Sequence, residues 1–302
     1  MDFLTRRSRR FLIAFVLVAI VGLVVGLIVG LRDTSTSDKS MVEREIERIE
    51  KLLEESPFNS SLRVQLAAYY IEAGAYDEAI DQAEFLLAQN DEYEMAYMIL
   101  GAVYMDQEKY EDALEPYLKV VELNEDNPMR GLNKQLQRAQ YDLGRIYIAL
   151  GEPEKAIEPL RATSVAMSTD ADSRYFLGVA YSDMGQCNDA IEWLLEAIRF
   201  VPTFTEAYEE LAHCYQEVGN TTGAAYATGM VDYCSERYEQ ALDNLGAAVA
   251  GGPQFAEAHL GLAMTYEKVG QTQDAIEAYQ AVLELDPDNT LAGARLNQLR
   301  EQ

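Results

Sequence analysis

The 302-residue sequence contains few of the residue types on which catalytic and metal sites depend. It has two histidines and three cysteines. Three cysteines are too few for a disulfide scaffold, and the odd number leaves at least one thiol unpaired. His213 and Glu217 lie four residues apart, but a third metal ligand is missing. The chain also lacks the His-Glu-x-x-His, Gly-x-Ser-x-Gly and phosphate-loop motifs. We therefore expect no metal, no cofactor and no enzymatic activity.

Basic residues are scarce as well. The chain has 24 Lys and Arg residues against 51 Asp and Glu residues, and its formal net charge is −27. A body this acidic repels the phosphate backbone of nucleic acids and anionic lipid surfaces. Nucleic-acid binding is therefore excluded as a function class.

The exception to this acidity is the N-terminus, where residues 1–10 contain four arginines and residues 11–31 contain no charged residue. As a helix, 21 apolar residues extend about 32 Å, which matches the hydrocarbon thickness of a bilayer. The arginines place residues 1–10 in the cytoplasm and the chain after residue 31 on the extracytoplasmic side. A cleaved signal peptide is the alternative, but its apolar region is shorter and ends at a small-residue site. Residues 32–40 are predicted to be a polar tether. The short arginine-rich N-terminus and the short tether are typical of a bacterial cell-membrane protein.

Three glycines of the apolar segment fall on one stripe of the predicted helix. Gly22, Gly26 and Gly30 are spaced four residues apart. Small residues at this spacing let two membrane helices approach closely, which favours a homodimer or packing on another membrane subunit. The alternative is that glycine is simply common in membrane helices.

Beyond residue 58 the sequence repeats itself. The word Leu-(Gly/Ala)-x-x-Tyr occurs six times. Its leucines are Leu66, Leu100, Leu143, Leu177, Leu211 and Leu262. Four residues after the tyrosine comes a glycine in every unit but one, where Glu108 takes its place, and an alanine follows five residues later. Leucine and tyrosine four apart share one helix face, and the glycine ends that helix. Each unit is therefore predicted to be a helical hairpin, and such units stack into a solenoid.

This pattern resembles the tetratricopeptide repeat (TPR) family, and the resemblance covers residues 42–302. It implies an all-α fold, a right-handed superhelix of helical hairpins, whose concave face binds proteins or peptides. Together with the apolar segment, it predicts a transmembrane helix over 11–31 followed by a solenoid over 59–289. Helices over 41–58 and 290–302 are expected to cap its ends. A short coiled-coil dimer is the alternative for the first of these.

Two irregularities interrupt the repeat, because successive leucines of the word are 34, 43, 34, 34 and 51 residues apart. Nine extra residues near 128–136 either lengthen the next helix or form a projecting loop. The 51-residue spacing, near 220–238, contains a degraded first helix. There Thr228, Gly229 and Asp232 stand where Leu, Gly and Tyr belong. A glycine in a helix interior costs about 1 kcal/mol, so we expect a kink or weak point at Gly229.

The resemblance also places the first helix of each unit on the concave face. The family's Lys and Asn clamp for a terminal carboxylate is absent from these positions. Instead the face is predicted to be methionine-rich near the membrane, basic and aromatic in the middle and acidic beyond. The candidate partner-binding residues are Met95, Met98, Met105, Arg138, Tyr141, Arg145, Tyr175, Glu206, Glu209 and His213. Methionine surfaces adapt to varied apolar partners, although Met95 and Met98 are equally suited to packing between repeats.

The sequence therefore predicts a membrane-anchored TPR scaffold or adaptor that binds partner proteins or peptides on the extracytoplasmic side, beside or within a membrane protein complex. The alternative is a periplasmic chaperone-like assembly factor for exported or membrane clients.

Overall fold

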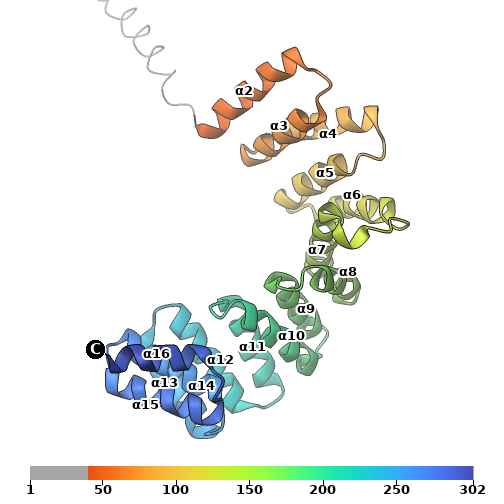
Figure 1. Cartoon of the computed structure of the whole chain (residues 1–302). Helices are drawn as coiled ribbons and strands as arrows, with labels where there is room; N and C mark the ends of the chain where they lie inside the picture. The colour runs from red at the N-terminus through yellow and green to blue at the C-terminus, as the bar shows by residue number, and fades with distance from the viewer. Residues whose placement is uncertain (1–39, 302) are drawn as a thin grey trace, which may run out of the picture. The chain divides into compact units, whose positions relative to one another are not determined.

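The computed structural model describes residues 40–301, and every regular element in this range is helical. The prediction of an all-α fold is confirmed. In the first half the helices are α2 (Met41–Glu55), α3 (Ser60–Glu72), α4 (Tyr76–Gln89), α5 (Glu94–Asp106), α6 (Tyr110–Leu123), the 3-10 turn η2 (Arg130–Leu132), α7 (Lys134–Ala149) and α8 (Pro153–Ala166). They continue as α9 (Ala171–Asp183), α10 (Cys187–Phe200), α11 (Thr205–Glu217), α12 (Thr221–Cys234), α13 (Tyr238–Gly251), α14 (Ala256–Lys268), α15 (Thr272–Leu285) and α16 (Thr290–Arg300) (Figure 1).

The chain forms two compact units that divide after Ile99. In the first unit, Ile49 and Leu53 of α2 are buried against Leu66 of α3. The α2 helix begins at a capping box, in which Ser40 and Glu43 exchange side-chain and backbone hydrogen bonds. The apolar face of α2 is therefore used within its own chain, as a capping helix requires.

Within the second unit, the small residue of the repeated word marks the point where the two helices of a hairpin touch. A Cβ atom on Gly144 would lie 2.3 Å from Cγ of Leu160, and one on Gly178 would lie 2.6 Å from Cγ of Leu194. Both leucines belong to the second helix of the hairpin. In these two hairpins glycine makes room for the leucine side chain of the second helix, which an added methyl group would displace.

The turn glycines also do what the sequence predicts. Gly74, Gly151, Gly185, Gly219 and Gly270 all have positive φ angles, between 70° and 77°. Glu108 adopts the same left-handed conformation, with φ 56°, and so does Glu236, with φ 59°. This conformation is strained for residues other than glycine. Glu236 therefore marks one more hairpin turn, which the repeated word does not reveal.

The 51-residue irregularity is explained by α12, which serves two hairpins. Its N-terminal part pairs with α11, where Gly223 lies against the ring of Tyr215. Its C-terminal part pairs with α13, where Gly229 lies against Leu245 just as Gly144 lies against Leu160. The α12 helix is continuous through Gly229, and Gly229 is its contact point with α13. The expected kink or weak point at Gly229 stays a prediction. The irregularity is thus half a repeat, a single shared helix.

The nine-residue irregularity is divided between the two predicted outcomes. The α7 helix has 16 residues, whereas α5, α9, α11 and α14 have 13 each. The remaining extra residues widen the connection between α6 and α7 into a loop that contains η2 (Figure 1). Residues 124–133 are called the α6–α7 insertion below.

Within residues 40–301, no helix is both long and apolar enough to cross a bilayer. The predicted transmembrane helix over 11–31, residues 32–39 of the tether and Gly22, Gly26 and Gly30 lie outside the described residues, whereas Ser40, assigned to the tether, caps α2.

Candidate partner-binding groove

Three first helices of the second unit lie in a row and carry most of the predicted binding residues. The α7 helix contacts α9, and α9 contacts α11. Arg138, Tyr141 and Arg145 lie on α7, Tyr175 on α9, and Glu206, Glu209 and His213 on α11. The row ends at α11, because the next first helix, α14, packs against α12. In that contact Gly261 of α14 lies against Met230 of α12. The shared helix α12 therefore starts a second row.

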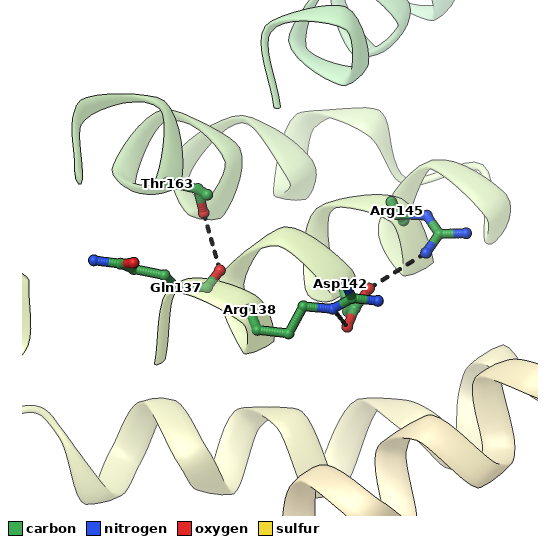
Figure 2. A network of polar contacts seen from close by, with 5 residues as sticks. All are labelled: Gln137, Arg138, Asp142, Arg145 and Thr163. Atoms are coloured by element: carbon green, nitrogen blue, oxygen red, sulfur yellow. Dashed lines mark hydrogen bonds and ion pairs between the residues drawn. The ribbon is translucent and has the colours of Figure 1, made fainter. Parts of the chain in front are cut away.

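At the centre of α7, two arginines are held by one buried carboxylate (Figure 2). Arg138 donates from Nε to Oδ2 of Asp142 at 2.6 Å, and Arg145 donates from Nη1 to Oδ1 at 3.3 Å. The Asp142 side chain is only 2% exposed, whereas that of Arg138 is 60% exposed. A buried carboxylate requires partners of opposite charge. Asp142 therefore orients two guanidinium groups whose outer N–H groups face solvent.

Burial and the neighbouring Asp142 carboxylate raise the pKa of Tyr117, on α6, well above its ordinary value. The phenol therefore stays protonated at neutral pH. Asp142 is thus surrounded by two cationic side chains and one neutral phenol.

Aromatic rings continue from this charged cluster along the row of helices. Tyr141 meets Phe176 edge to face at a centroid distance of 5.7 Å. Tyr175 lies 5.0 Å from Phe176 and 4.9 Å from Phe204, which precedes α11. The Arg145 guanidinium lies 5.6 Å from the Tyr141 ring centroid and 5.7 Å from that of Phe176. These four rings, called the aromatic ladder below, are half-buried and offer flat apolar surface beside positive charge.

A cavity of about 400 Å³ opens beside the ladder, between α7 and the start of α9. Lys134, Arg138 and Tyr141 line its α7 side, and Asp170 and Asp172 line the opposite side. Burial and the charge of Asp170 raise the pKa of Asp172. Burial raises the pKa of Tyr141 to about 12, so its hydroxyl is neutral and able to donate. The cavity thus has a cationic wall, an anionic wall and an aromatic ring between them.

Thr163 of α8 also lines this cavity, and Figure 2 shows it beside the backbone oxygen of Gln137. Its Oγ1 donates to the backbone oxygen of Pro159 at 3.0 Å or of Gln137 at 3.3 Å. The side chain is almost fully buried, so the hydroxyl requires these acceptors. The bond to Gln137 ties α8 to α7 at the turn that presents Arg138.

The acidic end of the predicted face forms a separate site. His213 lines another cavity, of about 560 Å³, together with Asp183, Asp189 and Glu217. Glu206 and Glu209 are exposed on α11. Burial raises the pKa of Tyr175, and the negative charges of Glu210, Glu206 and Glu209 raise it further. Among residues 40–301, no group of three or more His, Cys, Asp or Glu side chains is arranged to hold a metal ion.

The methionines do not form one surface that the structure can describe. Met95 and Met98 belong to the first unit, whereas Met105 belongs to the second. All three are half-buried on α5, and Ala96, Ile99 and Val103 fill its buried face. Partial burial suits both packing between repeats and partner binding, so both readings stay predictions.

The sequence did not single out the residues that organise this groove. Asp142 lies four residues after Arg138 and three before Arg145, a spacing at which helical side chains pair. That signal was available. Phe176 lies in an apolar run, and Phe204 stands alone between two threonines, outside the repeated word. The role of Lys134 depends on the insertion that lengthens α7.

Successive antiparallel helices, close glycine contacts and left-handed turns define a solenoid of helical hairpins. Comparison with protein families agrees: tetratricopeptide repeats match residues 64–128, 137–161, 171–200 and 256–289. The chain belongs to the tetratricopeptide repeat family.

Solved structures of other repeat proteins share the fold. YrrB, described as a TPR protein with an unusual peptide-binding site, has 19% sequence identity and a TM-score of 0.50. That similarity covers 70% of this chain and 96% of YrrB. The C-terminal part of a repeat protein from Cytophaga hutchinsonii has 20% identity and a TM-score of 0.52, covering 83% of this chain and 93% of that one. These similarities show the fold alone.

Among curated proteins, the chain is similar to the BBSome complex member BBS4 of Bos taurus. The two are 23% identical over 243 residues, which is 75% of this chain and 45% of BBS4. The chain therefore spans less than half the length of this relative.

Proposed function

We propose that this protein is a scaffold or adaptor that holds a partner protein against the face formed by α7, α9 and α11. The observation that carries the proposal is the pair of arginines fixed by Asp142 beside the aromatic ladder. Arginine and tyrosine are frequent anchors of protein interfaces. Because their geometry is fixed before binding, less conformational entropy is lost when a partner binds.

The groove suits a protein segment better than a small metabolite. The cavity beside Tyr141 is open and is lined by charges of both signs. The acidic residues Glu206 and Glu209 lie further along the same row of helices. A matching partner segment places an apolar or aromatic side chain against the ladder and basic side chains toward α11.

Two comparisons support this class of function. YrrB is described as a TPR protein with an unusual peptide-binding site, and BBS4 is described as a member of the BBSome complex. The fold of this chain exposes a row of first helices, whose side chains are available to contact other proteins.

The site of action that we propose is the extracytoplasmic face of a bacterial cell membrane. The support is the apolar run over 11–31 preceded by four arginines. The glycine stripe would then pack the anchor against a second copy or another membrane subunit. Reporter fusions after residue 302 test the topology: alkaline phosphatase should be active and a cytoplasmic fluorescent reporter dark. The opposite pattern would place the repeats in the cytoplasm.

Partner binding is tested by quantitative crosslinking pull-down of the full chain from membranes of cells that express it naturally. The double variant Arg138→Gln with Asp142→Asn removes the Arg138–Asp142 ion pair and the charged partner of Arg145, and it keeps the net charge. The matched control is Lys155→Gln with Glu152→Gln, an exposed ion pair at 2.8 Å at the start of α8, the second helix of the same hairpin. The first variant should lose the partner and the control should retain it.

The same experiment separates the scaffold from the alternative chaperone. One dominant complex recovered in fixed stoichiometry indicates a dedicated scaffold. A broad set of exported proteins indicates a chaperone-like assembly factor. Equal recovery by both variants would rule out the α7–α9 groove as the binding site.

A further inference from the structure

The α6–α7 insertion presents apolar side chains to solvent. Met129 is 62% exposed and Leu132 is 74% exposed, and Val165 at the end of α8 is 77% exposed. Arg130 and Gly131 of the insertion line a cavity of about 330 Å³ together with Val165 and Ala166 of α8. Val165 lines this cavity, and Met129 and Leu132 directly flank its lining residues Arg130 and Gly131 in the chain. Single exposed apolar residues are normal, but several beside one cavity form an apolar patch that favours a binding partner over water.

Buried polar groups hold this insertion in place. Asn124 is almost fully buried, and its Oδ1 accepts from the Nδ2 atoms of Asn127 at 2.9 Å and Asn133 at 2.8 Å. Asn127 in turn accepts from the backbone N–H of Met129, and Asn133 caps α7. Because every member of such a network needs its partners, the loop has one preferred conformation. Met129 and Leu132 are therefore presented outward by a built structure.

The charge around the patch is opposite to that of the molecule. The charged residues that line the cavity are Arg130, Arg161 and Glu158, a net charge of +1 in a chain of net charge −27. No ion pair or side-chain hydrogen bond of Arg130 is found within the described part of the chain, whereas Arg161 donates to the hydroxyl of Tyr181 at 2.9 Å. At physiological salt, charges are screened over about 8 Å, so this local excess decides which ligands are attracted.

We propose that the α6–α7 insertion and the end of α8 form a second docking surface. Its occupant is a segment of another protein that carries carboxylates next to one or two large apolar side chains. The apolar side chains enter the cavity against Val165 and cover Met129 and Leu132, while a carboxylate pairs with Arg130. The groove at Arg138 and Tyr141 lies on a neighbouring face of α7, since only Gln137 lines both cavities. The two surfaces are therefore separately testable.

Selection of a random-peptide phage library on the immobilised full chain tests this proposal. Enriched peptides should combine Asp or Glu with Leu, Ile, Phe or Met. Their synthetic forms should bind at least about tenfold more weakly to Met129→Ser with Leu132→Ser, and to Arg130→Glu. Val269→Ser, which alters an exposed apolar residue at the end of α14, is the control and should bind normally. Circular dichroism should show all variants folded, because the altered side chains are exposed.

Three results would overturn the proposal: no enriched peptides, enriched peptides that are basic or uncharged, or binding that is insensitive to the insertion variants. Loss of binding in the variant Arg138→Gln with Asp142→Asn, but not in the insertion variants, would assign the peptides to the groove instead. The proposed function would survive each of these results, because it depends on the groove alone.

Discussion

Gly229 packs directly against Leu245, and this contact identifies α12 as the first helix of a hairpin. A Cβ atom on Gly229 would lie 2.7 Å from Cγ of Leu245 and 3.0 Å from its backbone nitrogen. The same sixteen-residue relationship joins Gly144 to Leu160 and Gly178 to Leu194. The α12 helix is also the partner of α11, so it belongs to two hairpins at once. The row of first helices changes at this point.

Substituting Gly229 tests this packing. Gly229→Ala places a methyl group on the backbone and side chain of Leu245 and should lower the free energy of unfolding by about 1–3 kcal/mol, despite the better helix propensity of alanine. Gly246→Ala is the control, since its added Cβ meets nothing within 4 Å. It should stabilise the protein by about 0.5–1 kcal/mol. Urea unfolding monitored by circular dichroism measures both, and a neutral effect of Gly229→Ala would contradict the shared-helix account.

At the left-handed turns, introducing glycine should stabilise the protein and removing glycine should destabilise it. Glu236 has φ 59°, and Glu236→Gly should raise the free energy of unfolding by about 1 kcal/mol because glycine adopts this conformation without strain. Gly219→Ala, at an equivalent turn with φ 73°, should lower it by a similar amount. Thermal unfolding of the two variants should shift in opposite directions. Shifts in the same direction would mean that Glu236 is favoured by contacts other than its turn geometry.

Asp142 is the structural centre of the groove. Asp142→Ala leaves Arg138, Arg145 and Tyr117 facing an empty site and should lower the free energy of unfolding by about 2–3 kcal/mol. Lys155→Ala removes only an exposed ion pair and should change it by less than about 0.5 kcal/mol. Denaturant titration of both variants is the measurement. Similar small effects would show that Asp142 does not organise the two arginines.

Alkaline pH should unfold the protein through its buried tyrosines. Burial raises the pKa of Tyr208 to about 12 and that of Tyr226 well above its ordinary value. An unfolded tyrosine ionises near pH 10. Because the folded pKa is the higher one, this stabilisation is complete below about pH 10 and is lost as the pH rises toward about 12.

Urea titrations at about pH 8 and above pH 10 measure this loss. Tyr226→Phe should keep more of its stability at the higher pH, relative to its own value at the lower one. The chain has 19 tyrosines, so tyrosinate absorbance is compared between the parent protein and Tyr226→Phe. The part of the signal that this substitution removes should appear together with unfolding and not before it. Its appearance in the folded state near about pH 10 would show that the Tyr226 ring is open to solvent.

The sequence could predict the repeat units because local rules determine them. Leucine, small residue and tyrosine at helical spacing identify a first helix, and a glycine identifies its turn. The half repeat at α12 could not be recognised in this way. Its word contains Thr228 and Asp232, its turn residue is Glu236, and only the contact with Leu245 shows its role.

The groove was predictable in part. The positions of Arg138, Tyr141, Arg145 and Tyr175 on the first helices follow from their spacing relative to the repeated leucine. The ladder rings Phe176 and Phe204 and the cavity walls Asp170 and Lys134 depend on how neighbouring repeats are stacked, which sequence spacing does not determine. The separate position of His213 has the same origin.

The central claim is that the cavity beside Tyr141 contacts a partner protein. A photoreactive amino acid placed at Met167, which lines this cavity, and at Val269 as a control tests it most directly in intact cells. The account predicts one discrete crosslinked adduct from position 167, none from position 269, and loss of the adduct when Arg138→Gln with Asp142→Asn is added. No adduct from position 167, or an adduct that this variant leaves unchanged, would contradict it.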